Sequence, residues 1–207
     1  MARARKARAA AATPAGGISV QAVISALTAA LDARDGYTSE HSSATVALTQ
    51  TVGRRLGLDR DKLAELAQIA ALHDIGKLGV PTDIIRKPGP LTDEEWAIMR
   101  EHSSIGERIL KAVPDLAGVA RAVRHGHERW DGGGYPDGLA GEEIPLTSRI
   151  VFVCDAYDAM VSDRPYRPAM SCDEAIRELR AGAGTQFDPQ VVQCLLAALG
   201  EADEEVR

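Results

Sequence analysis

The sequence is poor in aromatic residues and contains no long apolar run. Phe, Trp and Tyr make up 4% of the 207 residues, and Ala and Leu dominate the periodic stretches, which favours helices over sheets. No apolar run approaches the roughly 20 residues that a membrane-spanning helix needs, so we expect no membrane association. The apolar content of 45% and the charged content of 26% are typical of a globular protein with one well-cored domain.

Cysteine pairs and an excess of basic residues are also absent. Cys154, Cys172 and Cys194 form an odd set without C-x-x-C spacing, which predicts buried thiols in a reducing, cytoplasmic compartment and argues against disulfides or a zinc knuckle. The formal net charge of −6 argues against a basic face that binds DNA or RNA. Attraction of an anionic substrate would therefore need a local cluster of Lys, Arg or metal ions.

The first 17 residues differ in composition from the rest of the chain. They read MARARKARAAAATPAGG, which is basic and Ala-rich but lacks the apolar centre of a secretory signal. We interpret residues 1–17 as a disordered tail or linker; an artificial or mis-called start and a basic arm that touches an anionic partner are the alternatives. Residues 18–207 are expected to form a single domain.

Most of the remaining sequence predicts a succession of seven or eight helices. Apolar residues at helical spacing predict helices over 18–33, 38–56 and 61–74. A capping box predicts another helix that begins at Thr92, and a further helix is expected from about Asp115 to Arg124.

The second half of the chain contains one long loop and three more helix signals. The loop from Glu128 to Pro145 holds seven glycines or prolines, which excludes a regular element. Segment 149–161 (RIVFVCDAYDAMV) could begin as a buried strand, but its length and spacing favour a helix. A capping box at Ser171 and an N-cap at Asp188, followed by proline, begin the last two helices.

His73 and Asp74 form the sharpest candidate site. They end the apolar face of a predicted helix, just before Gly76, where the helix can stop. A buried carboxylate without a partner is costly, so we expect it to be paired or bound to metal. Asp155 likewise closes an apolar run. Imidazoles and carboxylates together suit Fe, Mn, Zn or similar divalent ions, and the histidines available are His41, His73, His102, His125 and His127.

Three separated segments resemble those of a known family. They are HDIGKLGVP (73–81), HERWDGGGYPDGL (127–139) and DAYDAMVSDRPYR (155–167). In this order they resemble the HD-GYP family, the branch of the HD phosphohydrolases that hydrolyses cyclic di-GMP. The resemblance extends over about residues 34–188. It implies an all-α fold, a single HD-type helical domain of about seven helices with a long GYP loop.

The resemblance implies a role for each site residue. Asp74 would bridge two divalent ions, most simply iron or manganese, and Lys77 would contact the scissile phosphate. The metal ligands that it implies are His41, His73, Asp74, His102, His127 and Asp155. The residues that it places at the lip of the pocket or near the phosphates and bases of the substrate are Gly134, Tyr135, Pro136, Arg164 and Arg167.

Two positions depart from the family pattern. The family usually has two adjacent histidines before ERW, and Gly126 takes the place of the first one here. Either His125 reaches the metal through a local shift, or the second ion loses a protein ligand to water. Members with three metals have a glutamate at the position of Tyr37. We therefore expect two ions, the second of which can be labile.

The expected chemistry agrees with this residue set. Two metals a few ångströms apart can bridge a hydroxide, lower its pKa and clamp phosphate oxygens, while a Lys charge and Arg forks hold the rest of the phosphate. This chemistry fits a metal-dependent phosphodiesterase, and the resemblance implies one that opens cyclic di-GMP to linear pGpG, and onward to GMP if both bonds are cleaved.

Several alternatives stay open at this stage. The domain could be degenerate, without turnover, and dock a partner such as a cyclase domain or a response regulator. It could also hydrolyse another nucleotide, because a fold does not fix its substrate. Arg164 and Arg167 could form structural salt bridges, Tyr135 could simply pack the loop onto the core, and His125 could face solvent. The sequence leaves a homodimer open.

Overall fold

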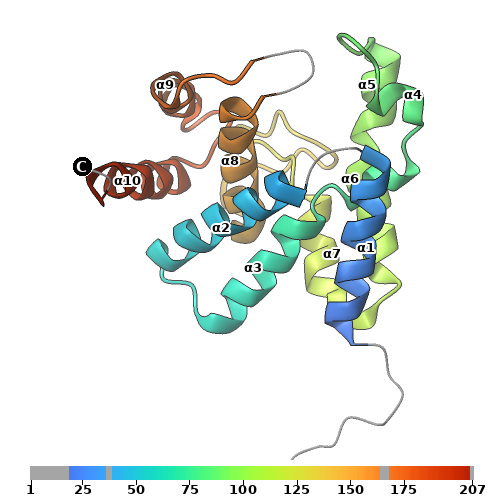
Figure 1. Ribbon diagram of the computed structural model, residues 1–207. Coiled ribbons are helices and arrows are strands. Elements are labelled where there is room, and N and C mark those ends of the chain that lie inside the picture. The colour runs from blue at the N-terminus through green and yellow to red at the C-terminus, as the bar shows by residue number, and fades with distance from the viewer. Residues whose placement is uncertain (1–18, 36–38, 164–167, 206–207) are drawn as a thin grey trace, which may run out of the picture.

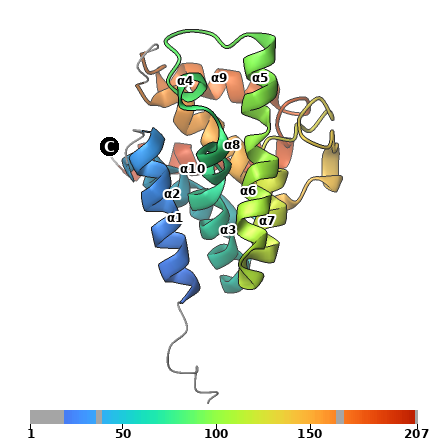
Figure 2. The same cartoon turned by 90° about the vertical axis from the view of Figure 1, so that its right-hand side faces the viewer.

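The computed structural model describes residues 19–35, 39–163 and 168–205, and the regular elements in these ranges are all helical (Figures 1 and 2). The predicted tail, residues 1–17, lies outside the described residues. The α-helices are α1 (Val20–Asp35), α2 (Ser39–Arg55), α3 (Arg60–Leu72), α4 (Thr82–Ile85), α5 (Asp93–Arg100), α6 (His102–Lys111), α7 (Ala117–Arg124), α8 (Leu146–Val161), α9 (Cys172–Gly182) and α10 (Pro189–Glu205). Short 3₁₀ helices are η1 (Ile75–Gly79), η2 (Pro114–Leu116) and η3 (Gly141–Glu143). The predicted all-α fold is confirmed.

Side-chain caps determine where several helices begin. The Thr92 hydroxyl accepts a hydrogen bond from the backbone N–H of Glu95, and the Glu95 carboxylate accepts one from the backbone N–H of Thr92. Ser171 and Glu174 repeat this reciprocal box at the start of α9. The Asp188 carboxylate accepts a backbone N–H at the start of α10, at 2.8 Å. All three predicted caps are therefore confirmed.

The helix pattern differs from the prediction in two details. The single-turn helix α4 was not anticipated, and the helix expected from Thr92 is divided at Glu101 into α5 and α6. The division lets α5 stay at the surface, with no buried residue, while α6 enters the core at His102. Segment 149–161, which was ambiguous in the sequence, is helical throughout as part of α8.

The three cysteines are free thiols. Cys154 is buried and Cys194 is partly buried, but Cys172 is exposed, because it begins α9 at the surface. The expectation of buried thiols is thus wrong for Cys172. Within the described ranges, no helix combines the length and apolar character that crossing a bilayer requires.

Helix α3 lies at the centre of the core, where it packs against α2, α7 and α8. Its side chains Leu66, Ile69 and Leu72 are fully buried, and burial of each such side chain contributes about 1.5–3 kcal/mol. His73 and Asp74 follow this helix directly, so the candidate site is attached to a helix whose apolar face lies in the core.

Gly76 allows η1 to approach α6 unusually closely. A Cβ atom at this position would lie 1.7 Å from the carbonyl oxygen of His102 and 2.6 Å from the backbone nitrogen of Gly106. Only glycine fits such a contact. The contact fixes the backbone of His102 beside that of Asp74, which comes two residues before Gly76.

Replacing Gly76 with alanine is expected to lower the free energy of unfolding by about 1–3 kcal/mol, because η1 and α6 must separate to admit the methyl group. Urea unfolding followed by circular dichroism measures this change. Gly200→Ala is the matched control, since a Cβ there meets nothing within 4 Å in helix α10. An unfolding midpoint of the Gly76 variant equal to that of the wild type would contradict the proposed close packing.

Candidate metal centre

The Asp74 carboxylate is surrounded by cationic and imidazole groups. The Lys77 ammonium donates a hydrogen bond to Asp74 Oδ2 at 2.7 Å. The Nε2 atom of His73 lies 3.5 Å from the same oxygen, and the Nε2 atom of His102 lies 3.7 Å from Oδ1. Asp74 directly precedes η1 and His102 begins α6, so the Gly76 contact brings these groups together.

Backbone carbonyls fix the orientation of two of these imidazoles. His73 Nδ1 lies 2.7 Å from the carbonyl oxygen of Ala70, and His102 Nδ1 lies 2.6 Å from that of Met99. A carbonyl oxygen can only accept, so each Nδ1 carries the hydrogen. In the neutral ring this leaves the lone pair on Nε2, the atom that faces Asp74, as is typical of metal-binding histidines.

His127 completes a group of atoms that fits a metal ion. One atom each from Asp74, His102 and His127 lie within 4.8 Å of one another. Among the described residues, the Nε2 atoms of His73, His102 and His127 are buried without a hydrogen-bond partner. A buried polar atom left unpaired costs about 1–3 kcal/mol. The atoms of His102 and His127, whose imidazoles are neutral, are explained by a divalent ion that accepts their lone pairs, and His73 can join them once its proton has left.

The charges in this cluster favour metal ligation. Burial raises the pKa of the Asp74 carboxyl, but Lys77, His73 and His102 lower it well below its usual range. Burial lowers the pKa of His102, and it also lowers that of His127, together with the nearby His102, to about 3. Asp74 is therefore an anion and these two imidazoles are neutral at pH 7, the forms that bind metals.

In the metal-free protein the pKa of His73 is raised, whereas the pKa values of His102 and His127 are lowered. Burial lowers the pKa of His73, but the Asp74 carboxylate and Asp155 raise it to about 9. Asp155, from the middle of α8, places Oδ1 3.5 Å from His73 Nε2. Helix α8 thus contributes a second carboxylate from more than 80 residues further along the chain than Asp74, next to the same imidazole.

A family model described as "HD domain" matches residues 25–191, most of the chain. This chain belongs to the HD domain family. Its three signature segments are those of the HD-GYP branch.

Curated relatives and solved structures agree with this assignment. The chain is 40% identical over 184 residues to the cyclic di-GMP phosphodiesterase response regulator RpfG of Xanthomonas campestris pv. campestris, covering 87% of this chain and 48% of the relative. It is 36% identical over 186 residues to the 3'3'-cGAMP-specific phosphodiesterase 3 of Vibrio cholerae. This match covers 90% of this chain and 40% of that relative.

The crystal structure of a cyclic GMP-AMP-specific phosphodiesterase of V. cholerae has the same fold, with a TM-score of 0.67 at 22% identity. The superposition covers 86% of this chain and 48% of the V. cholerae chain. The HD domain described here therefore spans less than half the length of the curated relatives that it matches.

The structure brings most of the predicted site residues of this HD domain together. His73, Asp74, Lys77, His102, His127 and Asp155 are joined by the contacts described above. His41 lies on α2, and its side chain is outside the described part of the chain; Arg164 and Arg167 are also outside the described residues. Their predicted roles remain predictions.

The GYP loop of this HD domain covers the histidines. The Tyr135 ring stacks on the ring of His127, with centroids 5.2 Å apart, and meets that of His102 edge-on at 6.2 Å. Gly134 permits the tight approach, because a Cβ atom there would lie 2.3 Å from the backbone nitrogen of Arg129. Pro136 follows Tyr135 through a cis peptide bond. The loop therefore packs against the ligand side chains and is not a freely solvated segment.

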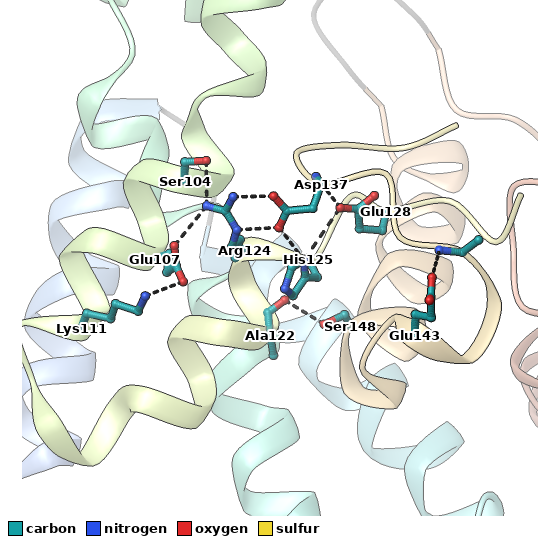
Figure 3. A network of polar contacts seen from close by, with 11 residues as sticks. Ser104, Glu107, Lys111, Ala122, Arg124, His125, Glu128, Asp137, Glu143 and Ser148 are labelled. Atoms are coloured by element: carbon teal, nitrogen blue, oxygen red, sulfur yellow. Dashed lines mark hydrogen bonds and ion pairs between the residues drawn. The ribbon is translucent and has the colours of Figure 1, made fainter. Parts of the chain in front are cut away.

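Among the predicted ligands with described side chains, His125 alone lies in a different group. Its Nδ1 atom is 3.5 Å from Asp137 Oδ2 and 3.8 Å from Glu128 Oε1. Figure 3 shows this group together with Arg124, which donates to both oxygens of Asp137 at 2.6 and 2.7 Å. The arrangement favours the alternative in which the second ion lacks a protein ligand, in place of a local shift of His125.

The His125 group anchors the GYP loop to the helices (Figure 3). Arg124, at the end of α7, also donates to Glu107 on α6, and the buried Glu128 accepts the backbone N–H of Asp137 at 2.8 Å. Although His125, Glu128 and Asp137 have the composition of a metal site, the guanidinium already occupies both Asp137 oxygens and neutralises its charge. We interpret the group as a structural link.

Sequence reasoning missed Met99 and Arg100. The Met99 carbonyl orients His102, and the Arg100 guanidinium carbon lies 5.6 Å above the Tyr135 ring. Met99 comes three residues before His102, as Ala70 does before His73, so this repeated spacing was a usable signal. Nothing in the sequence indicates that Arg100 contacts Tyr135, because the two lie 35 residues apart in different elements.

Proposed function

We propose that this HD domain is a metal-dependent phosphodiesterase that hydrolyses cyclic di-GMP to linear pGpG and then to GMP. One observation carries the proposal: buried imidazole Nε2 atoms without hydrogen-bond partners gather around the anionic Asp74. Curated relatives named as cyclic di-GMP phosphodiesterases support the choice of substrate.

The proposed ligands would hold two divalent ions, and Asp74, which has two carboxylate oxygens, is suited to serve both. The other ligands are His41, His73, His102, His127 and Asp155. Iron and manganese fit a mixed imidazole and carboxylate set. When bound, such ions supply an activated water and neutralise phosphate charge.

The chain's own residues position the substrate and balance its charge. The Lys77 ammonium, held 2.7 Å from Asp74 Oδ2, is a positive point charge beside the ligands that can also bind a phosphate oxygen. Tyr135 covers the face of His127, lies edge-on to His102, and would limit the access of bulk water from that side. Arg164 and Arg167 are proposed to hold the phosphates and bases.

The setting of the reaction is part of the same proposal. Free cysteines in the described part of the chain are consistent with a cytoplasmic compartment. Residues 18–207 would act as the catalytic domain and 1–17 as a tail or linker. A cyclase domain, a response regulator or a second copy of the chain would supply control.

A substrate panel tests this function. Protein loaded anaerobically with Fe(II) or Mn(II) is incubated with cyclic di-GMP, 3'3'-cGAMP and cyclic di-AMP, and products are separated by liquid chromatography. We expect pGpG, then GMP, from cyclic di-GMP at the highest kcat/KM. Turnover of 3'3'-cGAMP alone would move the assignment to the activity named for another relative. Metal-loaded protein without turnover of any of the three would favour the binding-module alternative.

A further inference from the structure

We propose that Arg100 and Trp96, both on helix α5, form a purine-binding subsite that recognises one guanine of the dinucleotide. The inference rests on the proposed function and adds two residues that hold the base and select it. It is argued from where α5 is attached, from the Arg100 guanidinium and from the exposed Trp96 indole.

Helix α5 is fixed directly to the metal centre. The carbonyl of Met99, in its last turn, lies 2.6 Å from His102 Nδ1, and His102 begins the next helix. In Figures 1 and 2, α5 projects at the same end of the molecule as α9 and the end of α8 that leads to it. A ligand held at Asp74 that extends toward this end would therefore pass close to the side chains of α5.

The Arg100 guanidinium lies close to the centre and keeps its donors available. Its carbon is 5.6 Å from the centroid of the Tyr135 ring, which stacks on His127. Arg100 is exposed, and within the described ranges it makes no hydrogen bond or ion pair. The aromatic face holds the planar group by a cation–π contact, while its five N–H donors stay free for a ligand.

Trp96 lies one helical turn before Arg100, on the same face of α5. With 44% of its surface exposed, it is the more exposed of the two large apolar side chains at the surface of the described residues, the other being Ile98 at 39%. Residues 96 and 98 point in different directions on a helix. An indole ring in this position offers a flat apolar surface beside a guanidinium.

This pair has the chemistry that recognises guanine. An aromatic ring stacks on any base, and an arginine fork donates two hydrogen bonds to O6 and N7 of guanine. Adenine presents an amino group in place of O6, so one donor of the fork would face another donor. Arg100 should therefore favour guanine over adenine, whereas Trp96 should bind both.

The test compares Arg100→Ala and Trp96→Ala with the wild type in the metal-loaded protein. Each kcat/KM is divided by that for bis(p-nitrophenyl) phosphate, a phosphodiester without a purine. We expect Arg100→Ala to lower this ratio about 30-fold for cyclic di-GMP and less than about threefold for cyclic di-AMP. Trp96→Ala should lower both ratios about tenfold. Arg100→Lys keeps the positive charge but cannot donate two parallel hydrogen bonds, so its loss of the cyclic di-GMP ratio should resemble that of Arg100→Ala.

Arg108→Ala and Ile98→Ala are the matched controls, as exposed residues outside the proposed subsite. Equal losses for cyclic di-GMP, cyclic di-AMP and the small phosphodiester, or no loss, would overturn the inference. The affinity for cyclic di-GMP, measured by calorimetry, distinguishes a failure of the subsite inference from a failure of the proposed function. If the wild type binds but does not hydrolyse, weaker binding by both variants supports the subsite although the function is refuted, and unchanged binding refutes both.

Discussion

Asp74→Ala is expected to abolish cyclic di-GMP hydrolysis, with a fall in kcat of about 10³-fold or more. The carboxylate contacts Lys77 and lies within 4 Å of the Nε2 atoms of His73 and His102. These groups keep it ionised, so its removal eliminates the negative charge that would hold the proposed ions. Initial rates from chromatography and metal content from mass spectrometry measure the two effects.

Asp74→Asn separates charge from shape, because asparagine keeps the side-chain size but cannot supply an anion. It should lose bound metal almost as completely as the alanine variant. Asp61→Ala, an exposed acidic residue in the first turn of α3, is the control for a general loss of acidic charge. An Asp74→Ala protein that keeps more than a tenth of the activity together with its metal would show that Asp74 is not the central ligand.

Removal of metal is the second change with a large expected effect. Dialysis against a chelator should eliminate hydrolysis, and addition of Mn(II) or Fe(II) should restore it. Rebinding should be tighter at pH 8.5 than at pH 7, because the pKa of His73 in the metal-free protein is raised to about 9. At pH 7 its proton must leave before an ion can bind, and one competing proton weakens apparent affinity about tenfold per pH unit below that value.

A metal-competition titration at the two pH values measures this difference. His127 and His102, whose pKa values are lowered, are already neutral and should add no further pH dependence in this range. Equal apparent affinities at pH 7 and 8.5 would indicate that the ion does not displace a proton from His73, and hence that His73 is not a ligand. Full activity after the chelator treatment would contradict the metal-dependent mechanism itself.

Much of the fold could be predicted from local sequence signals. The capping boxes at Thr92 and Ser171 determine where helices begin through contacts within four residues, and these contacts are confirmed. The all-helical character follows from apolar spacing in the same way. The division at Glu101 could not be predicted, because it depends on how α6 enters the core beside η1 and not on a breaker residue.

The metal centre was only partly predictable for the same physical reason. His73 and Asp74 end a buried helix face, so the sequence indicates that they are inside. The positions of the His125 and His127 side chains are harder to predict from the sequence. Helix α7 ends at Arg124, and neighbouring residues of the turn that follows point in different directions. His125 thus faces Asp137, whereas His127 reaches the centre. The contacts that hold these orientations, such as those of Arg124 and Glu128 with Asp137, come from residues 9 to 13 positions away and cannot be inferred from the turn itself.

Gly126 illustrates what a motif comparison leaves undecided. Its place in the family pattern belongs to a histidine, but a Cβ atom there would lie 3.3 Å from the carbonyl oxygen of Val123. A larger side chain therefore fits only if the turn gives way by a few tenths of an ångström. The affinity for the proposed second ion therefore depends on the backbone conformation of this turn, which cannot be read from the residue types alone.

The most direct test of the account is the position of manganese in crystals of the metal-loaded protein, measured by anomalous scattering at the manganese edge. We predict a strong peak in contact with Asp74, His102 and His127. No peak there, or a peak confined to His125, Glu128 and Asp137, would contradict the assignment of the catalytic centre.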